Sequence, residues 1–433
     1  MSGAEKGRLK SLREVFRIGN GPSSSHTIGP TRAAQLFKER TRRAARYCVT
    51  LCGSLGATGL GHMTQRAVSE ALAPAPCEIR LAPERILRHA NALEFAAFDE
   101  AGRQIDSWIV YSIGGGAIED ETGPILSGPP VTYPVSNIAE ALAWCERSVK
   151  PFWALVDETE PGIWDYMREV WQVMGAAVRR GMDSGESILP GGLNVPRKAE
   201  MTYDRAQTLG GIFRDLAIIA GAALAVAEEN AAGNVVVTAP TCGSAGVLPA
   251  ILHYFATVQG RSERQVLRAL ATAGLFGDSV VVNASVAGAE VGCQGEVGTA
   301  CAMAAAAAAQ LLGGTPHQVE YAAEMALEHH LGLTCDPVQG LVQIPCIERN
   351  AVAAMRALEC ATYALLGDGR HIISFDEAVE VMAQTGRDLQ SAYKETAMGG
   401  LAELWRRHRE RLEPKPRADD SSRRREARTE RDS

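Results

Sequence analysis

The spacing of hydrophobic residues changes about one third of the way along the chain. Apolar and polar residues alternate over residues 47–55, which is the period of a half-buried β-strand. Two further runs, 93–98 and 105–111, flank the sequence DEAGRQ and predict a β-hairpin. An amphipathic helix is predicted from Pro30, and a second helix after the glycine-rich stretch GATGLGH. The chain as far as residue 120 therefore predicts a small α/β domain.

From residue 138 onward the pattern has the period of an α-helix almost throughout. The segment before it, 121–137, holds four prolines and four serines or threonines, which is typical of a boundary between domains. We therefore predict an α+β protein, with a small α/β domain over residues 1–137 and a mostly α-helical domain over 138–402. The clearest predicted helices cover residues 213–230, 263–275, 299–312, 318–330 and 351–366, and the alanine run 304–309 predicts a tightly packed, buried helix.

The last segment of the sequence, 403–433, is rich in charges of both signs and poor in apolar residues. Such a composition cannot bury enough apolar surface to fold, so we predict a disordered tail. A role for this tail in binding RNA or a membrane is weakened by the acidic residues that lie among its arginines.

The net charge and the lengths of the apolar runs indicate which kinds of partner the protein binds. The formal charge is -7 and no basic stripe accompanies it, which argues against nucleic acid and favours a small molecule. The N-terminus lacks the apolar stretch of a secretory signal, and the longest apolar run, 216–227, is shorter than the roughly 20 residues that span a bilayer. We therefore expect a cytoplasmic protein with no membrane partner, whose ten cysteines are reduced.

Three of the cysteines lie in turns rich in glycine or proline: Cys293 in GAEVGCQGEVG, Cys335 in LTCDPVQG and Cys346 in VQIPCIERN. Such turns let a side chain and several backbone N–H groups point into one cavity. The separations of 42 and 11 residues differ from the paired C-x2-C motifs of structural zinc sites. Three thiolates can hold a 4Fe-4S cluster and leave one iron without a protein ligand. Spacing alone leaves ordinary buried cysteines as an equal alternative.

Several longer motifs accompany the cysteines. The sequences GPSSSHTIGP, GSLGATGLGH, YSIGGGAI, LPGGLNV and APTCGSAGVLPA occur in this order, followed by the cysteine motifs and by YKETAMGGL. Over about residues 15–402 the chain resembles the iron-sulfur L-serine dehydratases in these motifs and in their order. The resemblance implies a single-chain enzyme in which a β-type domain precedes an α-type catalytic domain, and it implies a homodimer. It also implies that Cys293, Cys335 and Cys346 bind a 4Fe-4S cluster, and that the chain eliminates water from L-serine to give pyruvate and ammonia.

The GPSSSHT loop precedes a predicted helix and fits the substrate end of this reaction. A helix N-terminus with hydroxyl groups beside it suits the carboxylate of an amino acid, so Ser24, Ser25 and Thr27 are the predicted substrate-binding residues. The same sequence is also typical of a plain N-cap. His26 and His62 are the predicted catalytic residues because imidazole titrates near neutrality, and the sequence leaves open which of them is the base.

Arg349, just after Cys346, and Lys394, in YKET, complete the predicted substrate-binding residues. A salt bridge at a helix N-terminus is an equally good interpretation of Arg349, and a surface position is the commoner role for a lysine. Two features depart from the family pattern: Cys242 stands where many relatives carry Asn or another residue, and no cysteine follows Cys360. Because some relatives end in a cysteine that caps the open iron, we expect an uncapped, oxygen-sensitive cluster here.

Two other functions remain open at this point. One is a dehydratase or lyase for another β-substituted amino acid, such as threonine or cysteine, which the products of turnover would reveal. The other is a non-catalytic iron-sulfur protein that binds a cluster or senses redox state. A pyridoxal phosphate enzyme is disfavoured because the sequence shows no lysine-centred cofactor motif.

Overall fold

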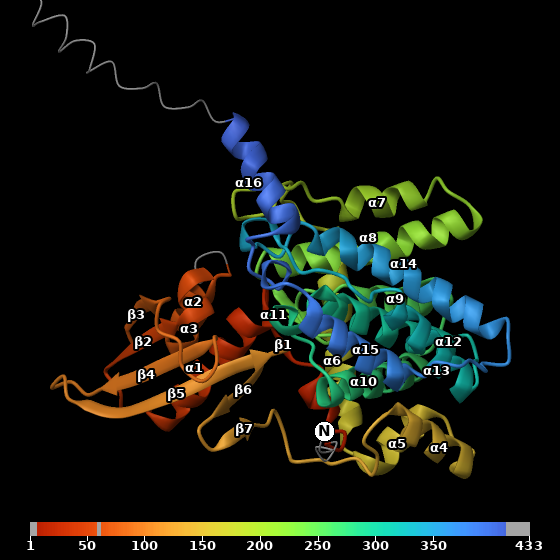
Figure 1. The fold of residues 1–433 in the computed structure, drawn as a ribbon, viewed down its shortest axis with the longest axis horizontal. Helices are drawn as coiled ribbons and strands as arrows, with labels where there is room; N and C mark the ends of the chain where they lie inside the picture. Colours follow the sequence, from red (N-terminus) through yellow and green to blue (C-terminus); the bar gives the residue numbers. More distant parts are fainter. Residues whose placement is uncertain (1–6, 59–61, 413–433) are drawn as a thin grey trace, which may run out of the picture.

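The computed structural model describes residues 7–58 and 62–412, in two regions of different secondary structure. Residues up to 125 contain a six-stranded sheet with helices against it, and residues after 137 are almost entirely helical. The sheet region lies on the left of Figure 1, and the helical region fills the right. This arrangement confirms the α+β architecture that the change in hydrophobic period predicts.

The sheet has the strand order β3-β2-β4-β5-β6-β7. Strands β2 and β3 are parallel, and every other neighbouring pair is antiparallel. β4 and β5 form the predicted hairpin, with Phe95 opposite Trp108. The strands are β2 (Arg46–Cys52), β3 (Cys77–Ala82), β4 (Ala92–Phe98), β5 (Gln104–Gly114), β6 (Ala117–Asp120) and β7 (Gly123–Ile125).

Helices α1 (Gly29–Arg40) and α3 (Thr64–Leu72) complete the core of the sheet region. Pro30 lies in the first turn of α1, as predicted, because its fixed φ suits a position whose N–H needs no partner. The ring of Phe37 lies 5.2 Å from that of Phe95 and stacks on Trp108, which fixes α1 to the hairpin. The short helix α2 (Gly53–Thr58) follows β2, and residues 59–61 of the predicted glycine loop lie outside the described residues.

The helical region is organised around α12 (Thr299–Leu311), which carries the alanine run. Every side chain from Ala304 to Ala309 is fully buried, which confirms the predicted buried helix. Because these side chains are small, α10, α13 and α14 approach α12 closely. The helices around it are α4 (Ile138–Ser148), α5 (Phe152–Thr159), α6 (Ile163–Met182), α7 (Ala199–Ala206), α8 (Gly211–Ala231), α9 (Val247–Thr257), α10 (Glu263–Asn283), α13 (Pro316–Glu328), α14 (Cys346–Leu365) and α15 (Phe375–Asp388).

Helix α14 begins five residues earlier than the hydrophobic pattern predicts, at Cys346 rather than at residue 351. Pro345 precedes it and has the fixed φ that suits entry into a helix. The side chain of Asn350 then closes the first turn, since its Nδ2 donates to the carbonyl of Cys346 at 2.8 Å. The cysteine therefore stands at a helix N-terminus rather than in a free turn.

The first described residues pack on the helical region rather than on the sheet. Residues 9–16, called the N-terminal strap below, bury Leu9, Leu12 and Phe16 in the main helical core. Strand β1 (Ile18–Asn20) continues this contact, because it pairs antiparallel with β8 (Val235–Val237). The chain thus crosses the helical region before it enters the sheet.

The segment predicted as a domain boundary, 121–137, also packs against the helical region. Tyr133 is fully buried in the same core as the N-terminal strap, and the N–H of Leu9 donates to the carbonyl of Val135 at 3.0 Å. The apolar residues between the four prolines of this segment therefore join the two regions. The limits of the two domains stay predictions.

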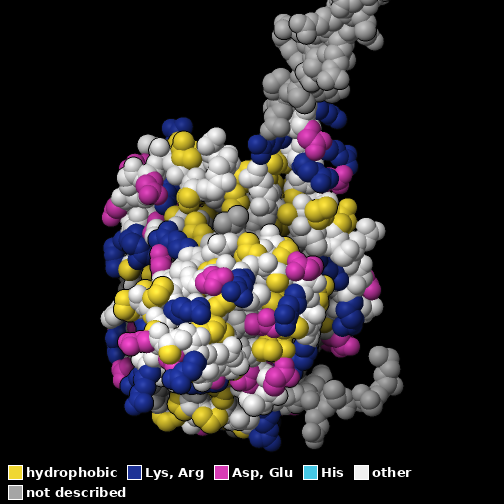
Figure 2. Space-filling model, turned by 90° about the vertical axis from the view of Figure 1, so that its left-hand side faces the viewer, with side chains coloured by type: hydrophobic (Ala, Val, Ile, Leu, Met, Phe, Trp, Pro, Cys, Tyr) yellow, Lys and Arg dark blue, Asp and Glu magenta, His cyan; other side chains and the backbone are white. Residues whose placement is uncertain are grey.

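The C-terminal helix α16 (Gly400–Leu412) extends into the charged segment for which we predict disorder, and residues 413–433 lie outside the described part of the chain. Helix α10 is long and apolar enough to cross a bilayer, but 78% of that stretch is buried inside the protein, as in the core helix of a globular domain. On the face of the molecule that Figure 2 shows, Lys and Arg side chains are interspersed with Asp and Glu.

Candidate active site

The three cysteines singled out in the sequence lie on three different elements of the helical region. Cys293 follows the short helix α11 (Gly288–Val291). Cys335 lies in an extended stretch that forms a bridge with Lys394, and Cys346 is the first residue of α14. All three thiols are buried.

Cys293 and Cys335 lie side by side, with their thiols hydrogen-bonded. Together with the carboxylate of Glu296 they offer three ligand atoms within 4.8 Å of one another. Gly288 makes this possible, because a Cβ there would lie 3.1 Å from Cys335 Sγ and 3.4 Å from Glu296 Oε2. A Cβ at Gly243 would lie 3.0 Å from the same carboxylate oxygen. The glycines of these motifs therefore make room for the site.

Arg349, on the first turn of α14, supplies positive charge to this group. Its guanidinium donates to Cys293 and to the carbonyl of Thr334, the latter at 2.6 Å, and lies 3.6 Å from Asp336. The hydrogen bond from Cys335 and the charge of Arg349 lower the pKa of the Cys293 thiol against the effect of burial. Cys293 is therefore held toward the thiolate, which is the form that binds metals.

Cys346 joins the group through the first turn of α14. The side chain of Asn350 holds this turn against the loop that precedes α9, because its Nδ2 donates to the carbonyls of Cys346 and Gly243, both at 2.8 Å. Burial, and then the charges of Cys293 and Glu296, raise the pKa of the Cys346 thiol. The Cys293 thiol therefore acts electrostatically on both Cys335 and Cys346, and three buried thiols suit a soft, thiolate-bound metal centre.

A second carboxylate reaches the cysteines from the segment before α16. Glu395 has a φ of 58°, and its N–H donates to the carbonyl of Cys335 at 2.7 Å. Burial raises the pKa of Glu395 to about 7. Burial, followed by the charges of Cys293 and Glu395, raises the pKa of Glu296 well above its usual range. Few non-glycine residues adopt such a φ, so the backbone is constrained where this acid enters the site.

His26 and His62 meet in the sheet region, where their ring centres are 4.3 Å apart. His26 lies in the π-helical turn η2 (Ser24–Ile28), with Nδ1 2.9 Å from Ser25 Oγ and Nε2 3.2 Å from Ser54 Oγ. Burial, and then the neighbouring His62, lower the pKa of His26 well below its usual range. Burial lowers the pKa of His62 to about 4. Both imidazoles are therefore neutral at pH 7, the form that accepts a proton.

His62 links the histidine pair to the cysteines. Its ring lies beside the backbone of Gly340, which belongs to the loop between Cys335 and Cys346. The imidazoles of the sheet region therefore adjoin the part of the helical region that holds the thiols and carboxylates.

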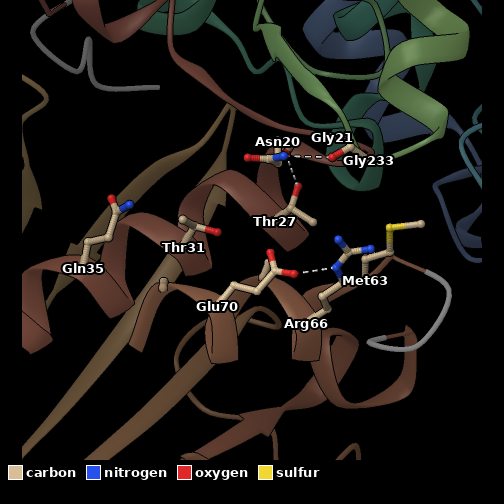
Figure 3. A pocket seen from close by; sticks show the side chains of 11 residues that line it. Asn20, Gly21, Thr27, Thr31, Gln35, Met63, Arg66, Glu70 and Gly233 are labelled. Carbon is tan, nitrogen blue, oxygen red and sulfur yellow. Dashed lines mark hydrogen bonds and ion pairs between the residues drawn. The ribbon is translucent and has the colours of Figure 1, made fainter. Parts of the chain in front are cut away.

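The other predicted residues of the GPSSSHT loop differ in their surroundings. Ser24 is buried in η2, and Ser25 contacts His26. Thr27 donates to the carbonyl of Asn20 at 2.8 Å, so its hydroxyl fastens the turn. It faces a separate cavity of about 220 Å³ where the sheet and helical regions meet, which Figure 3 shows from close by. This cavity is lined by Asn20, Gly21, Thr27, Thr31, Gln35, Met63, Arg66, Ala67, Glu70, Ala71 and Gly233.

Sequence reasoning missed Glu296 and Glu395 and singled out Lys394 in place of its neighbour. The Nζ of Lys394 donates a hydrogen bond to the carbonyl of Arg387 at 3.4 Å. The charge of the next residue, Glu395, acts on the Cys335 thiol. For Glu296 a signal was present, since an acidic residue lies among glycines three positions after Cys293. For Glu395 no local signal exists, because its place depends on the backbone pairing with Cys335.

Comparisons with known proteins cover both regions. The family model "Serine dehydratase alpha chain" matches residues 136–402, and the model "Serine dehydratase beta chain" matches residues 11–80. The L-serine dehydratase of Streptomyces coelicolor is 43% identical over 90% of this chain and 98% of that protein. The L-serine dehydratase of Mycobacterium tuberculosis is 42% identical, over 90% and 97%. L-serine dehydratase 1 of Escherichia coli is 40% identical, over 90% and 98%.

Proposed function

Because the chain belongs to the serine dehydratase family, we propose that it is an L-serine ammonia-lyase, which converts L-serine to pyruvate and ammonia. The observation that carries this proposal is the contact of His62, whose ring pairs with that of His26, with the Gly340 backbone in the loop between two of the three buried cysteines. The similarity to the relatives named L-serine dehydratase extends over nearly the whole length of those proteins and 90% of this chain, so the shared sequence includes both the histidine and the cysteine motifs.

We assign Cys293, Cys335 and Cys346 as the ligands of a 4Fe-4S cluster. The donor set supports this, because all three thiols are buried, Cys293 is held toward the thiolate, and Gly288 leaves space beside Cys335. When bound, a cluster with three thiolate ligands supplies a Lewis acid that assists the departure of hydroxide from the β-carbon. Arg349, which contacts Cys293 and Thr334, holds two of the ligand segments together.

The histidine pair supplies the base. The α-proton of L-serine is weakly acidic, so its removal needs a neutral acceptor in place at the site, and burial keeps both imidazoles neutral. As the proton moves to an imidazole, the C–H electron pair forms the double bond between the α- and β-carbons, and hydroxide leaves. The resulting aminoacrylate tautomerises to an imine, and water hydrolyses the imine to pyruvate and ammonia. Ser25 and Ser54 fix the ring of His26 for this step.

The turn before α1 binds the carboxylate of the substrate. Ser24 and Ser25 stand at the start of the helical turn that runs into this helix, where free N–H groups and hydroxyls attract an anion. Thr27 supports this part of the site by holding the turn to Asn20. Arg349 and Lys394 were expected to bind substrate as well; their contacts with backbone carbonyls instead favour roles in holding the segments around Cys335.

The test is anaerobic purification with assays of iron and sulfide, followed by turnover of L-serine. We expect iron and sulfide in the protein and release of pyruvate with ammonia in equal amounts. Iron-free protein that still consumes L-serine would overturn the cluster assignment. In the same assay 2-oxobutyrate would reveal turnover of threonine, and sulfide release would reveal turnover of cysteine. A protein that retains its cluster but turns over none of these amino acids would overturn the proposed activity.

A further inference from the structure

A cavity of about 350 Å³ lies where the sheet region meets the helical region, and the proposed reaction does not use it. Strand β1, helix α1 and helix α6 contribute to its walls, and it adjoins the cavity that Figure 3 shows, because Asn20, Thr31 and Gln35 line both. Its volume far exceeds the roughly 30 Å³ that one water molecule occupies. This space is called the seam cavity below, and its polar lining includes Arg17, Thr31, Arg32, Gln35, Ser127 and Glu169.

Arg17, one of the two arginines in the seam cavity, is fully engaged by the protein. Its guanidinium forms an ion pair with Glu14, and it donates to the Ser127 hydroxyl and to the Gly115 carbonyl, both at 3.0 Å. Its positive charge is therefore balanced by a carboxylate. Its other donors hold the sheet region to the segment that leads into the helical region.

Arg32, the second arginine, is not engaged in this way. Its Nη2 donates to the carbonyl of Ile125 at 2.8 Å, but its Nη1 is buried and has no hydrogen-bond partner among the described residues. Nor does any acid in the described part of the chain form an ion pair with it. Burial, and then the charge of Arg17, lower the pKa of Arg32, and the charge of Glu14 offsets this only in part. A positive charge and a buried donor therefore lack partners within the protein, which costs free energy.

Two uncharged groups of α1 lie beside Arg32 in the wall of the seam cavity. The Thr31 hydroxyl and the Gln35 amide have no hydrogen-bond partner among the residues that the structure describes, and they lie one helical turn apart on the same face. Glu169, on α6, is the acid among the lining residues, and its exposed position leaves its charge screened by solvent. A guanidinium, a hydroxyl and an amide N–H are all donors that suit the oxygen atoms of an anion.

We propose that the seam cavity binds a small oxyanion, a phosphate or a carboxylate, through Arg32, with Thr31 and Gln35 as further donors. The oxyanion accepts a charge-assisted hydrogen bond from the guanidinium and balances its charge. These three residues have no part in the proposed reaction, so the inference does not depend on the proposed function.

The position of this site on α1 links it to the turn that carries a histidine of the active site. Turn η2, which contains His26, runs directly into α1. Ile28, at their junction, is packed tightly, because a Cβ at Gly19 or at Gly116 would lie 2.9 Å from its side chain. Arg32 follows this junction by about one helical turn. A bound oxyanion therefore stabilises α1 where the two regions meet, and it should raise the unfolding midpoint because it binds only the folded protein.

The experiment measures the binding of inorganic phosphate and of acetate to the full chain by anaerobic calorimetry, at an ionic strength held constant with sodium chloride. The variants are Arg32→Gln, which removes the charge, and Thr31→Val, which removes only a hydroxyl. The matched control is Arg40→Gln, at an exposed position of α1 that pairs with Asp106. We expect the wild type and the control to bind at least one probe with the same Kd. Arg32→Gln should raise this Kd about 10- to 100-fold and Thr31→Val about 2- to 10-fold, the losses typical of a charged and a neutral hydrogen bond.

The probe that binds identifies the source of the oxyanion. Binding of phosphate alone assigns the seam cavity to a phosphorylated ligand, and binding of acetate alone assigns it to a carboxylic acid. Absence of saturable binding for both probes would overturn the proposal and leave water as the partner of Arg32. An equal Kd in Arg32→Gln and the wild type would also overturn it, because the anion would then bind elsewhere.

Unfolding midpoints measured without a probe show whether each variant folds. If Arg32→Gln does not fold, Arg32→Lys and Thr31→Val decide the question, because lysine keeps the charge but loses the forked donors of the guanidinium. A higher Kd in either variant supports the site, and an unchanged Kd in both would reject it.

Discussion

Two groups of buried acidic side chains stand in contrast in this molecule. In the helical core Glu160 accepts hydrogen bonds from the Ser11 hydroxyl at 2.5 Å and from the Leu12 N–H and the Tyr133 hydroxyl, both at 3.3 Å. Nearby, Asp278 accepts from the backbone N–H of Lys10 at 2.6 Å. These acids, called the strap acids below, hold the N-terminal strap to the helices.

Glu296 and Glu395, called the site acids below, have different surroundings. Their neighbours include the thiols and each other, and each also accepts a hydrogen bond, Glu296 from the Thr241 side chain and Glu395 from the Ala289 N–H. The strap acids meet hydrogen-bond donors of the strap, whereas the site acids lie against thiols, and ionisable groups that cluster in this way are typical of functional sites. The comparison therefore separates acids that fasten the fold from acids that serve the chemistry, and each group makes its own predictions.

The largest effect is expected at the thiols beside the site acids. Replacing Cys293, Cys335 or Cys346 by Ser should remove the iron and abolish pyruvate formation together, because serine is a much weaker ligand for iron than thiolate. The matched control is Cys301→Ser, which should keep iron and activity, because the Cys301 thiol on α12 donates to the Ala353 carbonyl on α14 at 3.2 Å. Iron, sulfide and pyruvate assays check this. Full activity in any of the three ligand variants would remove that residue from the cluster.

The next largest effect is expected at the histidine pair. His62→Ala should lower kcat by about 10²- to 10⁴-fold, the usual contribution of general acid–base catalysis, while the iron content stays at the wild-type level. His329→Ala, which removes an exposed imidazole at the end of α13, serves as the control. Steady-state kinetics normalised to iron gives the answer. If kcat falls by less than a few-fold in both His26→Ala and His62→Ala, neither histidine transfers the proton.

The fold could be predicted from the sequence where local periodicity decides the structure. The hairpin of β4 and β5, the start of α1 at Pro30 and the buried alanine helix all follow from spacing over a few residues. The strap was not predicted, because Leu9, Leu12 and Phe16 form a short run whose burial depends on helices far along the chain. Local signals carry no information on such long-range contacts.

The candidate site divides in the same way. The cysteines were found from their glycine- and proline-rich turns, the resemblance to a known family then implied their role, and His26 lies in one of the motifs of that family; all of these signals are contiguous stretches of sequence. Glu395 could not be found in this way, since its position follows from the pairing of its segment with Cys335 in the folded chain. Lys394 itself pairs with Cys335 through its backbone, its Nζ donates to the Arg387 carbonyl, and the charge of the next residue acts on the Cys335 thiol.

A strap acid should affect stability and leave the chemistry alone. Glu160→Ala removes the acceptor of the Ser11, Leu12 and Tyr133 donors, and buried donors without partners should lower the free energy of unfolding by about 3 kcal/mol. Glu158→Ala, which breaks an exposed pair with Lys150, should cost less than about 1 kcal/mol. Anaerobic denaturant unfolding measures both, and kcat per iron should equal the wild-type value. A large fall in kcat at unchanged stability would place Glu160 with the site acids.

The smallest effect is expected at the second strap acid and depends on pH. Burial raises the pKa of Asp278 to about 8, with Glu14 and Glu160 adding to the rise and Lys10 opposing it. An unfolded aspartate has a pKa of about 3.9, so between about pH 4 and pH 8 the folded protein holds a proton that the unfolded chain lacks. Stability should therefore fall as pH rises through this window, by about 1 kcal/mol between pH 7 and pH 8 from this group.

Asp278→Asn tests this directly, because asparagine keeps an acceptor for the Lys10 N–H and carries no titrating proton. We expect the variant to lose this contribution to the pH dependence, so that its unfolding midpoint falls less than that of the wild type between pH 7 and pH 8. Asp183→Asn, at an exposed position after α6, should keep the wild-type dependence. Equal slopes for Asp278→Asn and the wild type would show that Asp278 is ionised in the folded protein. It would then hold its charge on a buried carboxylate whose Oδ2 accepts from the Lys10 N–H and whose Oδ1 has no hydrogen-bond partner among the described residues.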